Sequence, residues 1–369
     1  MSTHLTKLNS FSRWPTSSPA IRAGLFVALC LLSFTLGCTA QIEESVVIYA
    51  DTDREYAEPI LAAFARRHAG LDVVRKYDVD SPQTSGVVKK LGSQRSQLQA
   101  DVLWNSDILH TLRLEKAGLL RPIAWDIPGA WPRQLRSSQG RGSQAQWVGF
   151  ASRARVLLIH RDSLPESESR PTSVMDLADP QWQGRAGMAL PLRGAAAAHF
   201  TILRDRLGAT QADDWFQRVK QNAVVLASDK QVAQAVSSGR LAFGLTDTDH
   251  ALVEIDAGHP VEIVFPDQQP DQSGALRLPN TVAVLADCAH PVAAAELANY
   301  LISSDTEGRL AMGVSGQFPV RPGHPQASRA QAAASVRWME VDFDSAAQQW
   351  DAAAAKLREI FGSPAAGDE

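Results

Sequence analysis

The sequence has no run of positively charged residues, and its charges nearly balance. Lysine and arginine together number 36 against 40 aspartate and glutamate residues, a formal net charge of −4. Because nucleic-acid binding needs a basic patch or stripe, it is excluded as a leading function. The hydrophobic fraction of 45% is typical of a packed globular chain, and the length of 369 residues predicts two domains.

Apolar runs of membrane-spanning length are also lacking. The longest largely apolar stretch, residues 23–37, carries no charge and is shorter than the roughly 20 residues that a spanning helix needs. Basic residues precede it and the small Gly37 ends it, a pattern that predicts a cleaved signal peptide over residues 1–37. A permanent single-pass anchor is the alternative.

Cysteine is scarce, and the position of each cysteine matters. Cys30 lies in the predicted signal peptide, and Cys38 follows it directly. The Gly37–Cys38 junction resembles the lipobox of bacterial lipoproteins, which implies that Cys38 is lipidated and that residues 38–45 form a tether to the membrane surface. Only Cys288 then remains, so we expect no intrachain disulfide.

The common catalytic motifs are absent. The chain has no His-Glu-x-x-His, no Cys-x-x-Cys, no phosphate-binding Gly-x-x-x-x-Gly-Lys and no Gly-x-Ser-x-Gly. We therefore expect a protein that is not an enzyme and holds no cofactor. The alternative is a carboxylate-dependent hydrolase, which turnover of phosphate or glycosyl esters would reveal.

Short apolar runs alternate with amphipathic segments in the first part of the chain. This alternation predicts parallel strand pairing and an α/β sheet. The expected strands are Val46–Tyr49, Leu71–Val74 and Asp101–Trp104, and the expected helices are Tyr56–His68, Val87–Leu98 and Asp107–Ala117.

Two breaks in this rhythm divide the chain. A segment rich in Pro, Trp, Gly and Ser, residues 122–146, precedes an expected strand pair, Trp147–Ala151 and Val156–His160, and residues 268–274 lack any periodicity. The last amphipathic segment is Asp344–Phe361, with Asp344 as N-cap. We predict a first lobe over residues 46–148, a second over 149–270, a return to the first over 271–325 and a C-terminal helical segment over 326–369.

Acidic loops follow two expected strands, Val46–Tyr49 and Leu241–Leu245, at residues 51–53 and 246–249. In open α/β sheets, ligands bind beyond the carboxyl ends of the strands. Carboxylates from both loops would supply the hard oxygen donors that suit highly charged cations, although the same side chains could instead cap the following helices. The candidate residues are Asp51, Thr52, Asp53, Thr246, Asp247, Thr248 and Asp249.

Three further segments offer polar or cationic groups. One follows the third expected strand, one opens an alanine-rich helix whose N-terminus favours an anion, and one places two arginines on one strand face. The arginines could instead pair with structural aspartates or lie in solvent. The residues are Asn105, Ser106, Arg193, Gly194, Arg153 and Arg155.

Several sequence segments, in the same order along the chain, resemble those of the iron(III)-type periplasmic solute-binding proteins of ABC importers. They include VVIYADTDREYAEPILAAFARRH, ADVLWNSDILHTLRLEKAGLLRPI, VSSGRLAFGLTDTDHAL and LPNTVAVLADCAHPVAAAELANYLISS. The resemblance extends from Val46 to Gly323. It implies a two-lobed periplasmic-binding-protein (Venus flytrap) fold of the α/β class, in which each lobe is a mixed sheet flanked by helices.

The resemblance also implies a function. The protein would capture ferric iron or another hard cation in the periplasm or at the cell surface, and deliver it to an ABC permease and its ATPase. In the best-known ferric members two consecutive tyrosines follow the strand that LAFGL matches, and here aspartates and threonines stand there. The expected metal ligands are therefore Asp51, Asp53, Asp247 and Asp249, with a synergistic anion at Arg193.

A second ligand model stays open. The cleft could take a small organic solute such as a polyamine, a phosphonate or a thiamine-like molecule, with its ammonium at Asp247 or Asp249 and its anionic end at Arg153, Arg155 or the Gly194 amide. In either model we expect Asp247→Ala and Asp51→Ala to weaken binding and to leave the melting temperature of the ligand-free protein nearly unchanged.

Overall fold

The computed structural model describes residues 44–77, 100–139, 144–165, 167, 169–330 and 335–362. The predicted signal peptide, Cys38, most of the predicted tether and the expected helix Val87–Leu98 lie outside the described residues. Within the described part, no helix combines the length and apolarity that crossing a bilayer requires.

The first lobe is built on parallel strands. The strand β1 (Glu44–Asp51) pairs in parallel with β2 (Leu71–Tyr77) and with β3 (Val102–Asn105). Helix α2 (Arg54–Arg67) follows β1, and α4 (Ile108–Lys116) follows β3. The expected alternation of strand and helix and the expected parallel pairing are confirmed for these elements.

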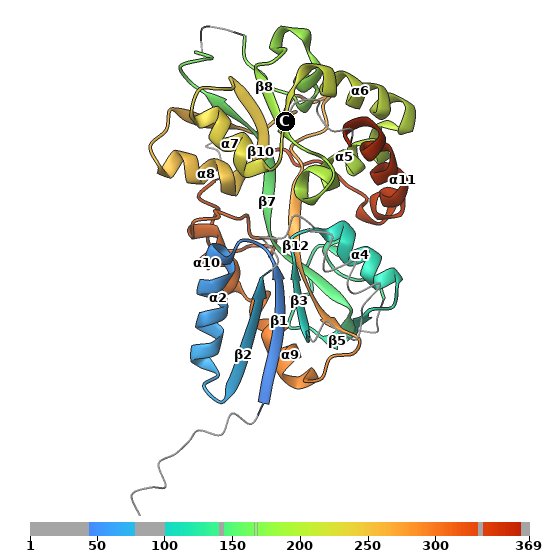
Figure 1. Ribbon diagram of the computed structural model, residues 1–369. Coiled ribbons are helices and arrows are strands. Elements are labelled where there is room, and N and C mark those ends of the chain that lie inside the picture. The colour runs from blue at the N-terminus through green and yellow to red at the C-terminus, as the bar shows by residue number, and fades with distance from the viewer. Residues whose placement is uncertain are drawn as a thin grey trace, which may run out of the picture. The chain divides into compact units, whose positions relative to one another are not determined.

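One long strand, β7 (Trp147–His160), replaces the expected strand pair and runs from the first lobe into the second (Figure 1). The predicted break between Ala151 and Val156 is therefore wrong. Ala151 has a φ of 28°, and the pairing of β7 with β12 (Arg277–Leu285) shifts register next to it. This β-bulge bends the strand without ending it, because both sides of the strand stay hydrogen-bonded.

The second lobe has a mixed sheet. Strand β7 continues antiparallel to β10 (Phe243–Asp247) and β11 (Val261–Val264). Strand β8 (Ala186–Ala189) lies parallel between β10 and β9 (Val224–Leu226). The helices of this lobe are α5 (Gly194–Leu207), α6 (Ala209–Asn222), α7 (Asp229–Ser237) and α8 (Thr248–Asp256).

A single hydrogen-bonded path joins the two lobes. Its strand order is β2-β1-β3-β12-β7-β10-β8-β9, so that β12 and β7 connect the lobes side by side. The predicted lobe boundaries at residues 149 and 270 stay predictions, since β7 and β12 belong to both lobes. The remaining elements are β4 (Leu120–Arg121), β5 (Ile123–Ala124), β6 (Gln144–Ala145), the 3-10 turns Arg133–Leu135, Val174–Ala178 and Pro180–Trp182, and helices α9 (Pro291–Leu301) and α10 (Ser304–Met312).

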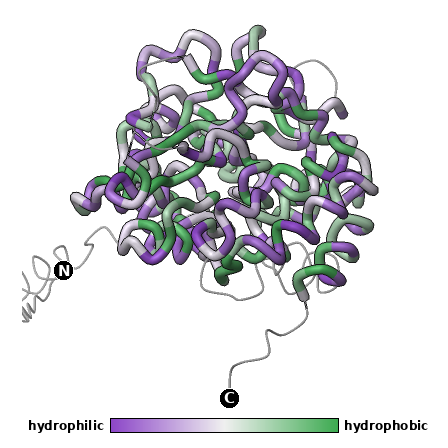
Figure 2. The backbone as a smooth tube through the Cα atoms, turned by 90° about the horizontal axis from the view of Figure 1, so that it is seen from above, coloured by the Kyte–Doolittle hydropathy of each residue, from purple (hydrophilic) through white to green (hydrophobic). Residues whose placement is uncertain are grey.

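The last helix, α11 (Phe343–Phe361), packs against α5 and α6 of the second lobe and against α4 of the first. Its N-cap is Asp342, whose side chain accepts a hydrogen bond from the Ser345 amide at 2.9 Å. The prediction of Asp344 as N-cap is therefore wrong by two residues. The outer helices alternate hydrophilic and hydrophobic stretches (Figure 2) and turn their apolar residues inward, as α2 does with Leu61 and Phe64.

Candidate ligand-binding cleft

A cavity of about 500 Å³ lies between the lobes. Its walls come from the loops that follow β1, β3, β8, β9 and β10, at the carboxyl ends of these strands, where α/β sheets bind ligands. The lining includes most of the candidate residues that the sequence suggested. These are Asp51, Thr52, Asp53, Ser106, Arg153, Arg193, Gly194, Asp247 and Asp249.

Four candidates, Asn105, Arg155, Thr246 and Thr248, are not among the residues that line this cavity, and Arg155 is fully buried. The Asn105 amide donates to the Thr111 hydroxyl at 2.9 Å. The Thr246 hydroxyl donates to the Asp229 carbonyl at 2.9 Å, and the Thr248 hydroxyl accepts from the Ala154 amide at 3.1 Å. Their polar atoms hold the loops in place, which is why they turn away from the cleft.

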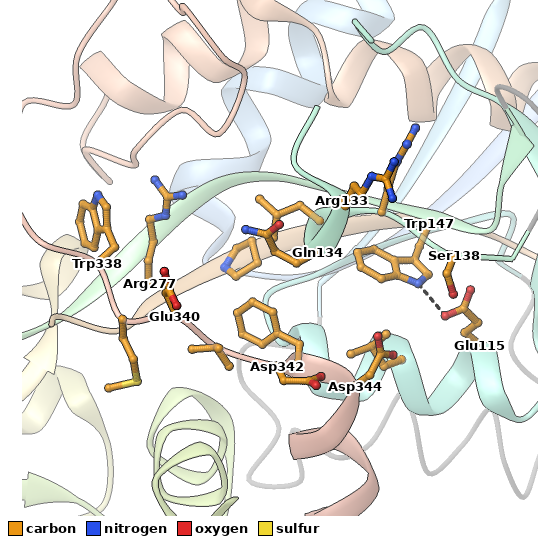
Figure 3. Close-up of a pocket in the computed structure, with 17 residues that line it drawn as sticks. Glu115, Arg133, Gln134, Ser138, Trp147, Arg277, Trp338, Glu340, Asp342 and Asp344 are labelled. Carbon is orange, nitrogen blue, oxygen red and sulfur yellow. Dashed lines mark hydrogen bonds between the residues drawn. The ribbon is translucent and has the colours of Figure 1, made fainter. Parts of the chain in front are cut away.

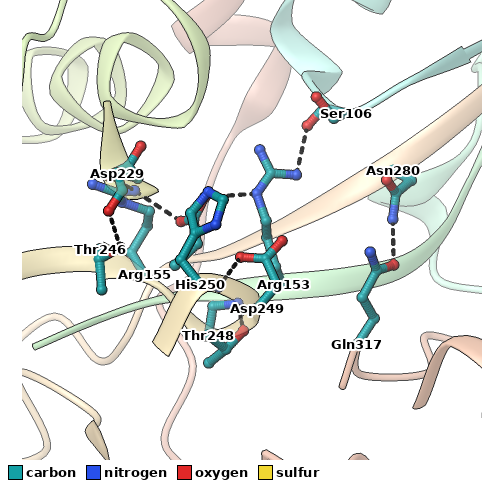
Figure 4. Close-up of polar contacts among 12 residues, drawn as sticks. Ser106, Arg153, Arg155, Asp229, Thr246, Thr248, Asp249, His250, Asn280 and Gln317 are labelled. Carbon is teal, nitrogen blue, oxygen red and sulfur yellow. Dashed lines mark hydrogen bonds and ion pairs between the residues drawn. The ribbon is translucent and has the colours of Figure 1, made fainter. Parts of the chain in front are cut away.

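Asp247 lies at the centre of a buried ion-pair network. Figure 4 labels its two arginines, Arg153 and Arg155, together with Asp229. Arg153 Nε donates to one carboxylate oxygen at 2.9 Å, and Arg155 Nη1 donates to the other at 2.8 Å. Arg155 also pairs with Asp229 at 2.8 Å and has no solvent-exposed surface. Burial alone would raise the pKa of Asp247, but Arg155 and Arg153 lower it to about 2. A cation at Asp247 would have to displace a guanidinium.

Arg153 links this network to the first lobe. Its Nη1 donates to the Ser106 carbonyl at 3.1 Å, and the Ser106 hydroxyl donates to Asp51 at 3.4 Å. Arg153 therefore does both things that the sequence left open: it pairs with a structural aspartate and it lines the cleft.

Asp249 and His250 form a second charged group on the second-lobe wall. The Asp249 carboxylate accepts a hydrogen bond from the His250 amide at 2.8 Å. Burial and the nearby Asp247 raise the pKa of Asp249 above its usual range. Burial alone would lower the pKa of His250, but Asp249, together with the other aspartates of the cleft, raises it. The sequence reasoning missed His250, although its place directly after the acidic loop was a usable signal.

Tyr56 of α2 was also missed. Its side chain is buried and lines the cleft. Burial, then the negative charge of Asp249 and Asp53, raises the pKa of Tyr56, so the phenol is uncharged at neutral pH. The sequence held a signal for Tyr56. It lies three residues after Asp53 at the start of a predicted helix, and residues at this spacing share one helix face.

The alternative in which the loop aspartates serve as helix caps is wrong for two of them. Asp53 and Asp247 occupy N-cap positions of α2 and α8, yet neither side chain accepts a capping hydrogen bond. By contrast, the Asp107 carboxylate caps α4 by accepting from the Leu109 amide at 2.9 Å. Capping therefore does not explain why aspartate stands at residues 53 and 247.

The second-lobe wall also carries groups that favour an anion. Helices α5 and α7 both begin at the cavity, and Gly194 at the start of α5 has a φ of 58°. Arg193 and Lys230 line the cavity beside these helix starts. The start of α5 has no side-chain cap, whereas Ser228 caps α7. The uncapped amides of α5, the helix dipole and two cationic side chains together attract negative charge. The cleft thus has an acidic wall at Asp51 and Asp53 and a basic stretch opposite.

Residues 60–337 match the family model of bacterial extracellular solute-binding proteins. The chain belongs to this family. As a bacterial extracellular solute-binding protein, it is exported, and its family consists of binding proteins.

Relatives of this solute-binding protein include iron proteins. The chain is 26% identical over 256 residues to iron uptake protein A2 of Synechocystis, covering 65% of this chain and 70% of the relative. It is 25% identical over 222 residues to the Fe(3+)-binding periplasmic protein of Serratia marcescens, covering 59% of this chain and 62% of the relative.

Solved structures confirm the two-lobed fold of this solute-binding protein. Apo ferric ion-binding protein A of Pasteurella haemolytica matches with a TM-score of 0.74 at 19% identity, over 86% of this chain and 97% of that one. Iron-bound HitA of Pseudomonas aeruginosa matches with a TM-score of 0.72 at 20% identity, over 86% and 99%.

The described residues contain no group of three or more His, Cys, Asp or Glu side chains placed to hold a metal ion. Asp53 and Asp249 nevertheless lie close enough across the cleft for the negative charge of Asp53 to raise the pKa of Asp249.

Proposed function

We propose that this protein is the extracytoplasmic solute-binding component of an ABC importer, and that it captures ferric iron between its lobes for delivery to a membrane permease and its ATPase. One observation carries the proposal. In a chain whose relatives are named as iron proteins, carboxylates from both lobes line one cavity at the strand ends.

Asp53 of the first lobe and Asp249 of the second are the proposed ferric ligands. Neither carboxylate is held by an arginine ion pair in the described part of the chain, whereas Asp247 is held by two. Hard cations prefer such oxygen donors. Tyr56 is the proposed third donor, because a nearby highly charged cation reverses the local pKa balance and favours the phenolate.

The basic stretch of the cleft would hold an anion that accompanies the metal. Arg193, Lys230 and the amides at Gly194 lie opposite the acidic loop. An anion there would fill coordination positions that the protein leaves open and would reduce the net charge of the bound cargo.

Cargo binding would be coupled to lobe movement. A ligand shifts a conformational equilibrium only by its difference in affinity for the two states, and a change from 1:99 to 99:1 needs about 5.5 kcal/mol. Contacts to Asp53 and Asp249 together provide such a difference, since these residues belong to different lobes. The movement would bring them close enough to share one ion.

Membrane attachment through Cys38 belongs to the same proposal. A lipidated Cys38 would keep the protein beside its permease through the predicted tether, residues 38–45, whose last two residues belong to β1. Metabolic labelling with a radioactive fatty acid tests this step: label on the wild type and none on Cys38→Ser supports it, and equal label on both rejects it.

Elemental analysis with native mass spectrometry tests the cargo. Protein purified without added metal and then stripped with chelator should take up one ferric ion per chain from ferric citrate. Asp53→Asn and Asp249→Asn should lose uptake, whereas Glu359→Gln, an exposed acidic residue on α11, should keep it. A bound organic molecule in place of iron would reject the ferric assignment and favour the organic-solute model.

A further inference from the structure

We propose that α11 is a brace between the lobes, and that its contact with α4 through Trp350 and Asp351 opposes the lobe movement that cargo drives. Trp350 then sets cargo affinity although it lies outside the cleft. The statement about affinity rests on the proposed function, whereas the statement about the brace does not.

Helix α11 is fixed to the second lobe at both of its ends. Near its start, the Ser345 hydroxyl donates to the Asp205 carboxylate, on the neighbouring α5, at 2.8 Å. At its end, the ring of Phe361 packs edge-on against Phe200 of α5, with 6.1 Å between centroids. Lys220 of α6 also donates to the Ile360 carbonyl. These anchors make α11 move with the second lobe.

The middle of α11 rests on the first lobe. The indole of Trp350 meets the ring of His110 edge-on, with 4.4 Å between centroids. The Arg113 guanidinium lies 5.6 Å from the centre of the same indole, and Arg113 Nη2 pairs with Asp351 at 2.9 Å. His110 and Arg113 both belong to α4. Burial lowers the pKa of His110, so the ring contact is uncharged at neutral pH.

Open space lies beside α4 and the segment that leads into α11. A cavity of about 770 Å³ is lined by α4, by the two connecting strands and by the segment that enters α11 (Figure 3). Trp147 and Arg277 of the strands point into it. The register of β7 with β12 puts these two side chains on the face opposite to Arg153, which lines the cleft. The lobes therefore have room to move against each other on this side.

Trp350 also lies near the loop that precedes the basic stretch of the cleft. Together with Pro191 and Leu192 it lines a small cavity of about 90 Å³, and these two residues immediately precede Arg193 and Gly194. A shift of α11 relative to α4 would therefore change the packing of the loop that carries Arg193 and Gly194.

The direction of the effect follows from the arrangement in which the contact exists. The proposal assigns the seating of Trp350 on α4 to the cargo-free arrangement of the lobes, and the distance and affinity measurements below test that assignment. If α11 slides along α4, the ring contact of Trp350 and the ion pair of Asp351 are both broken, because packed interfaces switch between discrete arrangements and do not deform continuously. Removing the contact lowers the free energy needed to reach the cargo-bound arrangement, and the apparent affinity rises by the same factor.

Two variants remove the contact, and two controls accompany them. Trp350→Ala deletes the indole, and Asp351→Ala deletes the ion pair at an exposed side chain, which leaves the core untouched. Trp350→Phe keeps an aromatic ring and should restore most of the wild-type behaviour. Glu359→Ala changes an exposed acidic residue of the same helix that pairs with Lys356 of α11 itself, and it should behave as the wild type.

The readouts are the lobe-to-lobe distance in cargo-free protein, by energy transfer between labels on α2 and α6, and ferric affinity by competition with citrate. We expect Trp350→Ala to shift or broaden the distance distribution and to bind ferric citrate about fivefold more tightly, with Asp351→Ala changing both in the same direction. Distances and affinity equal to wild type in both variants, or weaker binding by correctly folded Asp351→Ala, would overturn the brace. If the wild type binds no iron, the proposed function fails, and the distance measurement still decides the brace.

Discussion

At the scale of single residues, similar aspartates of one cleft have different roles. Both oxygens of Asp247 are held by Arg153 and Arg155, whereas Asp249 faces the cavity beside His250. Removing one partner of a buried ion pair leaves an uncompensated charge. These ion pairs lead us to expect that replacing Asp247 lowers stability, in place of the nearly unchanged melting temperature that the sequence alone predicted.

We expect Asp247→Asn to lower the free energy of unfolding by about 3–5 kcal/mol, because Arg155 and Arg153 lose their shared carboxylate. Asp53→Asn, which breaks no arginine ion pair in the described part of the chain, should change it by less than about 0.5 kcal/mol. Urea denaturation of both variants measures the difference, and equal stabilities would contradict the network.

His250 gives the cleft a pH-dependent contribution to stability. The aspartates of the cleft raise its pKa in the folded protein, so its contribution is complete below the unfolded pKa of about 6.5 and is lost as pH rises through the folded pKa. The stability advantage of wild type over His250→Gln should therefore shrink with rising pH. Denaturation curves at several pH values measure it, and an advantage that grows with pH would contradict the assignment.

At the scale of elements, local patterns predicted some segments and missed others. The apolar face of α2 identifies its helix, and Leu61 and Phe64 are buried as that pattern requires. Helix α8 was missed because Thr248 and Asp249 read as a polar loop, whereas tertiary contacts with β7 and α7 hold them in a helix. The sequence around Ala151 predicted a turn between two strands. The structure has a β-bulge there, and the hydrogen bonds between β7 and β12 continue on both sides of it.

The start of α5 allows a test of the basic stretch. Gly194 has a φ of 58°, and a Cβ there would meet no atom within 4 Å. Gly194→Ala should therefore cost only backbone strain, about 1–2 kcal/mol, and should weaken cargo binding by moving the helix amides. Gly129→Ala, also in open space and without positive φ, is the matched control. Unchanged binding and stability in Gly194→Ala would remove this helix start from the site.

At the scale of the whole molecule, the sequence predicted the position of the cleft better than it predicted how the charged residues of the cleft pair. The rule that ligands bind beyond strand ends placed both acidic loops correctly, because parallel strands present their carboxyl ends at one edge. The partners of Asp247 could not be predicted, since Arg153 and Arg155 are far from it in sequence and meet it only through the pairing of β7 with β10. The contact of α11 with α4 likewise depends on tertiary packing.

The central claim is that cargo is gripped by carboxylates of both lobes, which a small-angle scattering titration tests most directly. Chelator-stripped protein is titrated with ferric citrate while its radius of gyration and bound iron are measured together. The account predicts that the radius falls as iron binds and saturates at one ferric ion per chain, and that Asp53→Asn and Asp249→Asn show neither change. Iron binding at an unchanged radius of gyration would contradict the account. Iron binding by Asp53→Asn and Asp249→Asn to the same extent as by the wild type would also contradict it.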